Sequence, residues 1–85
     1  MTQAESGAAV RPDSTLDATG LLCPLPVLKA EKRLAAVPTG STLIVLATDP
    51  MARIDIPLFC RQQGHACEAG EADGVLSFSI TKAGG

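Results

Sequence analysis

The sequence contains no tryptophan or tyrosine and only two phenylalanines among its 85 residues. The core must therefore be aliphatic, and so short a chain predicts a single domain with a modest core. Positive charge is also scarce, because seven Lys and Arg residues are outnumbered by nine Asp and Glu residues. Tight, direct binding to nucleic acid needs a basic surface, so the net charge of −2 argues against it.

Long apolar runs and secretory features are missing as well. The longest apolar run, residues 43–47, falls far short of the ~20 residues that span a bilayer. The first dozen residues, MTQAESGAAVRP, lack the continuous apolar core of a secretory signal, and an odd count of three cysteines fits reduced thiols. We expect a cytoplasmic protein that does not enter a membrane, with a domain at 14–82 between loose tails at 1–13 and 83–85.

Turn signals divide this domain into six elements. A short extended pattern at 14–18 predicts a strand that stops at Thr19-Gly20. From Pro24 to about Val37, apolar residues recur at three- and four-residue spacing, which predicts a helix. The run at 42–47 is apolar at consecutive positions, as expected of a strand that is central or covered on both faces. The expected inward face of the helix comprises Val27, Ala30, Leu34 and Val37.

Pro57 decides where the second helix is expected to begin. The segment 48–50, Thr-Asp-Pro, offers a capping side chain before a proline. A proline inside a helix costs roughly 3 kcal/mol, however. We therefore expect the main helix at 56–63, capped by Asp55 and ended by Gly64. Its expected inward face comprises Ile56, Phe59, Cys60 and Gln63.

Two further strands are expected at 65–71 and 75–81, joined by a hairpin turn at Ala72-Asp73-Gly74. The order is then βαβαββ, with the first two strands parallel and the hairpin antiparallel. This predicts an α+β fold, a two-layer α/β sandwich of two helices on one face of a mixed four-stranded sheet. Functional groups in such sheets gather beyond the carboxyl ends of the parallel strands, where the loops 20–23 and 48–50 converge. The expected buried face of the last strand comprises Leu76, Phe78 and Ile80.

The stretch LLCPLPV places one cysteine before two prolines that bracket a single residue. If Pro24 takes the first helical position, Cys23 caps the helix and its sulfur sits at the positive end of the helix dipole, which favours the thiolate. The prolines lack N–H donors, so the stabilisation should be partial, and Pro26 disfavours helical geometry at Leu25, which allows a later helix start. A partly stabilised thiolate suits an atom that first attacks and later leaves. The competing structural interpretation makes Cys23 a small buried hydrophobe beside Leu22 and Leu25.

These residues resemble the TusA family of sulfur-carrier proteins, which includes SirA-like proteins and has a Cys-Pro-x-Pro signature. The resemblance covers residues 16 to about 82. Its motifs are Leu16-Asp17-Ala18, Gly20-Leu21, Cys23-Pro24-Leu25-Pro26-Val27, Thr48-Asp49-Pro50, Asp55-Ile56-Pro57, Phe59-Cys60, Gly64-His65 and Asp73-Gly74.

The resemblance implies a βαβαββ sandwich in which Cys23 carries a persulfide. Typical members accept sulfur from a cysteine desulfurase or a rhodanese-like donor and pass it to an acceptor protein, commonly for 2-thiouridine in tRNA, and in some members for sulfur oxidation or molybdenum cofactor chemistry. Each step exchanges one thiolate for another, so we expect no metal or organic cofactor, and we expect a monomer when the protein is free. Leu22 departs from the pattern, because many members place a basic residue there, and this leaves open which donor the protein serves.

Other chemistry has less support. Cys60, His65 and Cys67 form a C-x4-H-x-C spacing, but a zinc site would need a fourth ligand and usually has closely paired cysteines. We expect both cysteines in the core and His65 in a turn. The chain has no C-x-x-C motif, which disfavours a thioredoxin-like role. A single-thiol redox sensor and a non-catalytic regulatory module that binds a partner are the alternatives to a carrier.

Charged residues on the first helix are expected to be solvated, and Asp49 is expected to be a helix cap. Glu31 falls near the middle of the predicted apolar arc, where a buried charge would be costly. Either the helix is rotated, or Glu31 belongs to an exposed edge that a partner covers. The basic residues of this helix are Lys29, Lys32 and Arg33.

Overall fold

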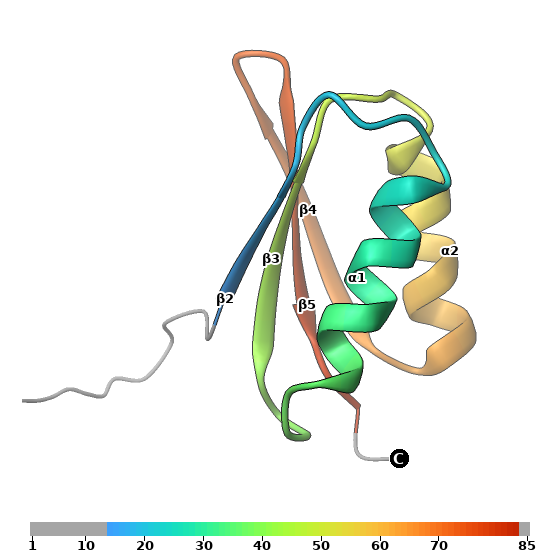
Figure 1. Ribbon diagram of the computed structural model, residues 1–85, viewed down its shortest axis with the longest axis vertical. Coiled ribbons are helices and arrows are strands. Elements are labelled where there is room, and N and C mark those ends of the chain that lie inside the picture. Colours follow the sequence, from blue (N-terminus) through green and yellow to red (C-terminus); the bar gives the residue numbers. More distant parts are fainter. Residues whose placement is uncertain (1–13, 84–85) are drawn as a thin grey trace, which may run out of the picture.

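The computed structural model describes residues 14–83 and packs two helices on one face of a four-stranded sheet (Figure 1). The tail predicted at 1–13 lies outside the described residues, as do residues 84–85 of the tail predicted at 83–85. The observed order βαβαββ and the two-layer α+β architecture are the predicted ones. The elements are β2 (Ser14–Ala18), α1 (Leu25–Ala35), β3 (Thr42–Ala47), α2 (Ala52–Gln63), β4 (Ala66–Ala72) and β5 (Val75–Thr81).

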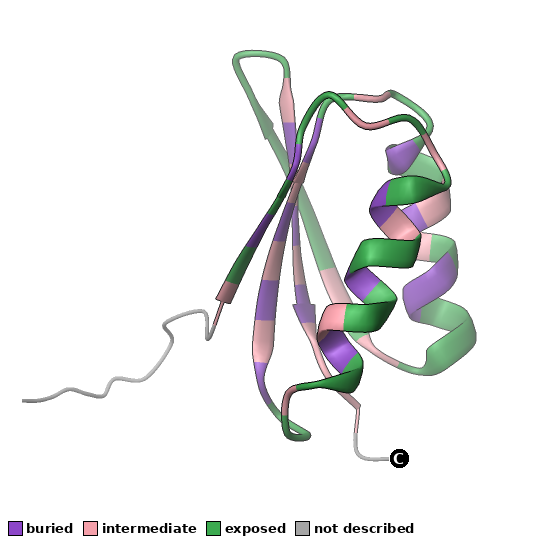
Figure 2. Cartoon of the chain, viewed as in Figure 1, coloured by how far each residue is buried: buried purple, intermediate pink, exposed green. Residues whose placement is uncertain are grey.

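The sheet has the strand order β2-β3-β5-β4, with β2 parallel to β3 and β5 antiparallel to both of its neighbours. β3 is central, as predicted, but the helices cover only one of its faces. Its side chains alternate between buried and half-buried, and the half-buried ones face away from the helices (Figure 2). The buried core cluster includes Leu43, Val45 and Ala47 from β3 and Leu76, Phe78 and Ile80 from β5.

The hairpin between β4 and β5 is closed by a two-residue turn. Asp73 and Gly74 have φ values of 54° and 81°, and Ala72 pairs with Val75 across the turn. Two positive φ angles match the right-handed twist of the strands, which is why Asp-Gly is favoured at this position. The turn confirms the predicted hairpin, although β4 starts at Ala66, one residue later than expected.

α1 begins one residue later than expected and differs in its cap. Pro24 occupies the N-cap position and Leu25 opens the helix, so Cys23 lies outside the cap. Pro26 follows in the first turn, where its missing N–H would have had no intrahelical partner. The helix ends at Ala35, before the expected Val37.

The buried face of α1 explains the position of Glu31. Pro26, Ala30 and Leu34 are buried, while Val27 is only partly buried and Glu31 is exposed. The helix is therefore rotated relative to the predicted arc, which removes the conflict of a charge in the core.

α2 starts at Ala52 and runs through Pro57, which corrects the predicted restart at Ile56. Pro57 cannot donate to the carbonyl of Arg53, a loss of about 3 kcal/mol for an interior proline. The longer helix buries both Ala52 and Ile56 completely, and that apolar burial offsets the lost hydrogen bond. Gly64, at φ 78°, ends the helix as predicted. Of the predicted inward face, Ile56, Phe59 and Cys60 are buried and Gln63 is exposed.

Candidate functional site

The loops that follow the two parallel strands meet at one end of the sheet, where both helices also begin (Figure 1). The Gly20 N–H donates to Thr48 Oγ1 at 2.9 Å, and the Cys23 N–H donates to Asp49 Oδ2 at 2.8 Å. The convergence of these loops, which the topology predicted, is confirmed and places Cys23 at their junction.

Asp49 holds both loops together with its two carboxylate oxygens. Oδ2 accepts the Cys23 N–H, and Oδ1 accepts the Met51 N–H at 3.0 Å just before α2. The hydrogen bonds from Cys23 and Met51 hold the pKa of Asp49 below its ordinary 3.8, so its carboxylate is charged at neutral pH. The N-cap of α2 is Met51, with no side-chain cap, so the prediction that Asp49 caps the helix is wrong. Asp49 instead binds the N–H of the N-cap residue and that of the cysteine loop.

Cys23 lies just before the N-cap of α1, near Asp55 in the first turn of α2. It is half-buried and packs against the edge of the core, and its peptide bond to Pro24 is cis. The carboxylate of Asp55, in the first turn of α2, acts on the Cys23 thiol and raises its pKa. Asp55 was predicted to cap a helix starting at Ile56. Because α2 starts four residues earlier, Asp55 instead points toward the cysteine.

The environment of Cys23 disfavours its thiolate. Burial raises the pKa of the thiol from 9.0 to about 11, and the hydrogen bond to Asp55 and the negative charges of Asp55 and Asp49 act in the same direction. The expectation that the helix dipole would favour the thiolate is therefore wrong. Pro24, rather than Cys23, occupies the cap, and carboxylates face the sulfur. At neutral pH the thiol of the free protein is protonated.

Cys60 belongs to the core, as predicted, whereas Cys67 is only half-buried and packs against the core. Cys60 is 1% exposed, and burial raises the pKa of its thiol to about 12. His65 accepts the Ala83 N–H through Nδ1 at 2.9 Å and its ring lies 5.9 Å from that of Phe59. Across residues 14–83, no group of three or more His, Cys, Asp or Glu side chains is arranged to hold a metal.

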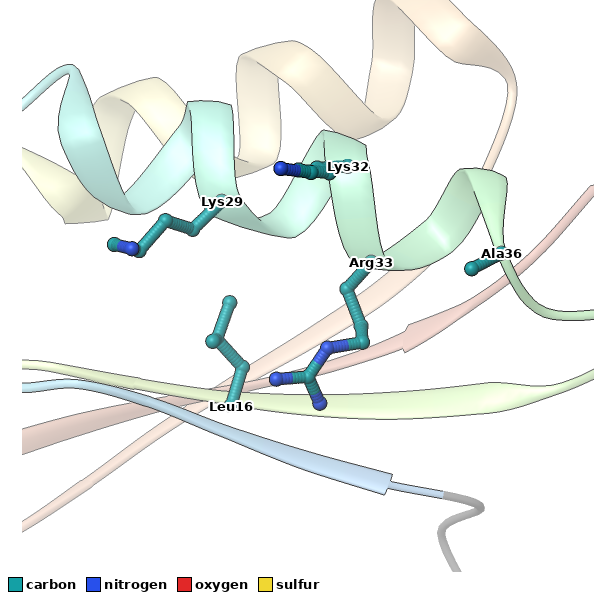
Figure 3. Close-up of a pocket in the computed structure, with 5 residues that line it drawn as sticks. All are labelled: Leu16, Lys29, Lys32, Arg33 and Ala36. Carbon is teal, nitrogen blue, oxygen red and sulfur yellow. The ribbon is translucent and has the colours of Figure 1, made fainter.

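The basic residues of α1 gather away from Cys23, around a groove between α1 and β2 (Figure 3). Leu16 projects from β2 toward the helix, and Arg33 reaches from the helix toward the sheet. Lys29 and Lys32 are exposed, as expected of solvated charges. The groove continues to Ala36, just beyond the C-terminal end of α1, whereas Cys23 precedes the N-terminal end.

Comparison with known proteins decides the family. Residues 14–82 match the family model described as sulfurtransferase TusA. The chain belongs to this family. It is 52% identical over 67 residues to proteins named "Putative sulfur carrier protein" from Neisseria meningitidis serogroup A (strain Z2491) and serogroup B (strain MC58), which covers 78% of this chain and 90% of each relative.

A solved structure agrees with this assignment. The crystal structure of a SirA-like protein from Desulfitobacterium hafniense has a TM-score of 0.75 and 32% sequence identity, and the match covers 84% of this chain and 99% of that chain. Membership in a TusA family implies donor and acceptor proteins as partners in general. Neither α1 nor α2 has the length and apolar character needed to span a bilayer.

The sequence analysis missed two features of this site. The first is the contact between Asp55 and Cys23, which depends on the true start of α2. The second is a set of exposed leucines at the N-terminal end of α1. Leu25 and Leu28 lie on the opposite side of the helix from the buried Ala30 and Leu34. Helix periodicity places both leucines outside the predicted apolar face, and this could have identified them from the sequence.

Proposed function

We propose that the protein is a sulfur carrier that takes sulfane sulfur as a persulfide on Cys23 and relays it to an acceptor protein. The donor would be a cysteine desulfurase or a rhodanese-like protein. The observation that carries the proposal is the position of Cys23 at the junction of the two loops, half-buried at the edge of the core, whereas Cys60 is 1% exposed. Membership in the TusA family supports it.

In the proposed loading step, the Cys23 thiol first loses its proton to solvent. The Cys23 thiolate then attacks the outer sulfur of the donor's persulfide. A sulfur–sulfur bond forms at Cys23, the donor's sulfur–sulfur bond breaks, and the donor cysteine leaves as a thiolate. In unloading, an acceptor thiolate attacks the outer sulfur of the Cys23 persulfide, and Cys23 leaves with the electron pair. Neither step changes the number of sulfane sulfurs or needs a cofactor.

The end use in this proposal is tRNA 2-thiouridine formation or sulfur oxidation. These routes differ in the acceptor protein and share the chemistry at Cys23. We propose the cytoplasm as the location, because three free cysteines suit a reducing compartment.

One observation favours the alternative, a regulatory or redox-sensing module that binds a partner without carrying sulfur. The pKa of Cys23 is raised to about 11, and a protonated thiol is a poor nucleophile. The carrier proposal therefore requires that something in the transfer complex releases the thiol proton.

Intact mass spectrometry tests the proposal. The protein is incubated with a cysteine desulfurase and L-cysteine, and separately with a thiosulfate-loaded rhodanese. A carrier gains the mass of one sulfur, and a reductant removes it. Cys23→Ser should abolish the gain, while Cys60→Ser should retain it. Sulfur on Cys60 or Cys67 would refute the assigned site, and no uptake from any donor would favour the regulatory module.

A further inference from the structure

The large apolar side chains that the described chain exposes are gathered at one end of the two helices. The helices run in the same direction and pack side by side, so their N-terminal halves form one outward surface (Figure 1). Leu22, directly before the cysteine, is 71% exposed. We call this surface the apolar patch. It consists of Leu22, Leu25 and Leu28 from the first loop and α1, and Met51, Ile54 and Leu58 from the N-cap and first two turns of α2.

The arrangement of the apolar patch is a consequence of helix periodicity. On α2, Met51, Ile54 and Leu58 recur at three- and four-residue spacing, which aligns them along one stripe. That stripe lies opposite the buried Ala52 and Ile56. Scattered exposed hydrophobic residues are ordinary on a monomer, but six of them on two neighbouring helices and the loop that carries a reactive cysteine indicate an interaction site.

The charges within the apolar patch have one sign. Asp55 lies in the first turn of α2, close enough to the Cys23 thiol to affect it, and Asp49 lies in the adjoining loop. The nearest cation on α2, Arg53, forms an ion pair with Glu71 on β4. Other basic side chains of the helices lie in their C-terminal halves or in the groove beside β2 (Figure 3). A complementary surface is therefore apolar with a basic group near its centre.

We propose that the apolar patch docks the sulfur-donating protein, and that this donor presents an apolar face with a Lys or Arg side chain aimed at Asp55. This inference rests on the proposed carrier function and names the chemistry of its partner. A cation paired with the Asp55 carboxylate neutralises a negative charge that opposes the Cys23 thiolate. Docking then makes it easier for the thiol to release its proton to solvent as the donor persulfide arrives.

The test compares a donor that must dock with one that need not. Inorganic polysulfide loads cysteines without a protein surface, whereas a cysteine desulfurase or a rhodanese from the same genome must bind. The variant Ile54→Ser/Leu58→Ser removes two exposed side chains of the apolar patch, and Gln62→Ser, also exposed on α2, is the matched control. Loading rates on Cys23 are followed by intact mass with the donor protein below saturation.

We expect the double variant to load from polysulfide within twofold of the wild-type rate, and to load from the protein donor at least tenfold more slowly. Gln62→Ser should match wild type with both donors. Equal loading of the double variant by the protein donor would overturn the docking proposal. Failure of the carrier function looks different, because wild-type Cys23 would then gain sulfur from neither kind of donor. Loading by polysulfide alone would leave the cysteine chemistry standing and overturn the docking.

Two further measurements separate the charge requirement and the identity of the occupant. Cationic and anionic methanethiosulfonates of equal size probe the field at Cys23. The cationic reagent should react faster, and Asp55→Asn should reduce that preference. An unchanged ratio of the cationic to the anionic rate would overturn the role of a basic group.

Sedimentation velocity tests self-association. A wild-type dimer that the double variant abolishes would mean that a second copy covers the apolar patch, which would also overturn the proposal.

Discussion

Asp55 is expected to keep the Cys23 thiol protonated in the free protein. Its hydrogen bond and its charge both contribute to the rise of the thiol pKa from 9.0 to about 11. Asp55→Asn removes the charge with little change of volume, so the pKa should fall toward 9.0. It should not fall completely, because burial is the largest cause of the rise and the Asp49 charge persists.

The effect on rate has two opposing parts. For each pKa unit by which the variant lowers the Cys23 pKa, the thiolate fraction at neutral pH rises about tenfold. The intrinsic nucleophilicity of the thiolate falls at the same time by about threefold, because attack rates follow thiol basicity with a Brønsted slope of about 0.4–0.5. The net reaction with a small disulfide at pH 7 should therefore accelerate about threefold per pKa unit.

The assay is the rate of Cys23 modification by 4,4′-dithiodipyridine between pH 6 and 10.5, with peptide mapping to assign the modified cysteine. Glu68→Gln, an exposed carboxylate on β4, is the control and should leave the profile unchanged. A thermal unfolding curve checks that Asp55→Asn is folded. An unchanged or higher Cys23 pKa in the folded variant would refute the assigned contact with Asp55.

The remaining predictions concern stability. Asp49→Asn should lower the urea midpoint at pH 7, because the charged carboxylate accepts the Cys23 and Met51 N–H groups. The folded pKa of Asp49 lies below its ordinary 3.8, so its stabilising contribution is complete at neutral pH and is lost as the pH falls through the folded pKa. The gap between the wild-type and variant midpoints should thus narrow as the pH falls below 3.8, and a gap that is constant with pH would contradict this origin. Ile56→Ala, at a fully buried site, should cost about 2–5 kcal/mol of unfolding free energy in urea, whereas Ile54→Ala, 60% exposed, should cost less than about 0.5 kcal/mol. Equal losses would contradict the orientation of α2.

The elements that could be predicted from sequence are those fixed by local rules. β5 alternates strictly between apolar and small polar residues, and Asp73-Gly74 closes a two-residue turn, so both the strand and its register follow from neighbours in sequence. The parallel pairing of β2 and β3 follows from the short βαβ connection. The same topology correctly brought the two loops of the site together, because parallel strands end at one edge of the sheet.

The start of α2 could not be predicted, because local and tertiary effects oppose one another there. Pro57 favours a helix that starts at Ile56. Only the complete burial of Ala52 beside Ile56 in the tertiary fold makes the helix that starts at Ala52 more stable. The contact between Cys23 and Asp55 depends on that outcome, since Asp55 as a cap would face a different direction. The direction of the pKa shift of the Cys23 thiol was also predicted wrongly, because a local rule was again opposed by tertiary effects. The helix dipole is a local rule, while burial and two carboxylates from another part of the chain come from the tertiary fold.

The high pKa of Cys23 and the exposed leucines around it are consistent with one requirement of the proposed relay. Oxidation of a cysteine follows its thiolate character and its exposure. A carrier has an accessible sulfur during the time between one partner and the next. Its cysteine is protected from oxidation if the thiol stays protonated until a partner binds. Leu22, where many family members have a basic residue, fits this arrangement, because a resident cation beside Cys23 would favour the thiolate at all times. This protein has no cation at position 22, and Asp55 raises the pKa of the Cys23 thiol. On the proposed mechanism, the thiol is therefore activated by the protein that docks on the apolar patch.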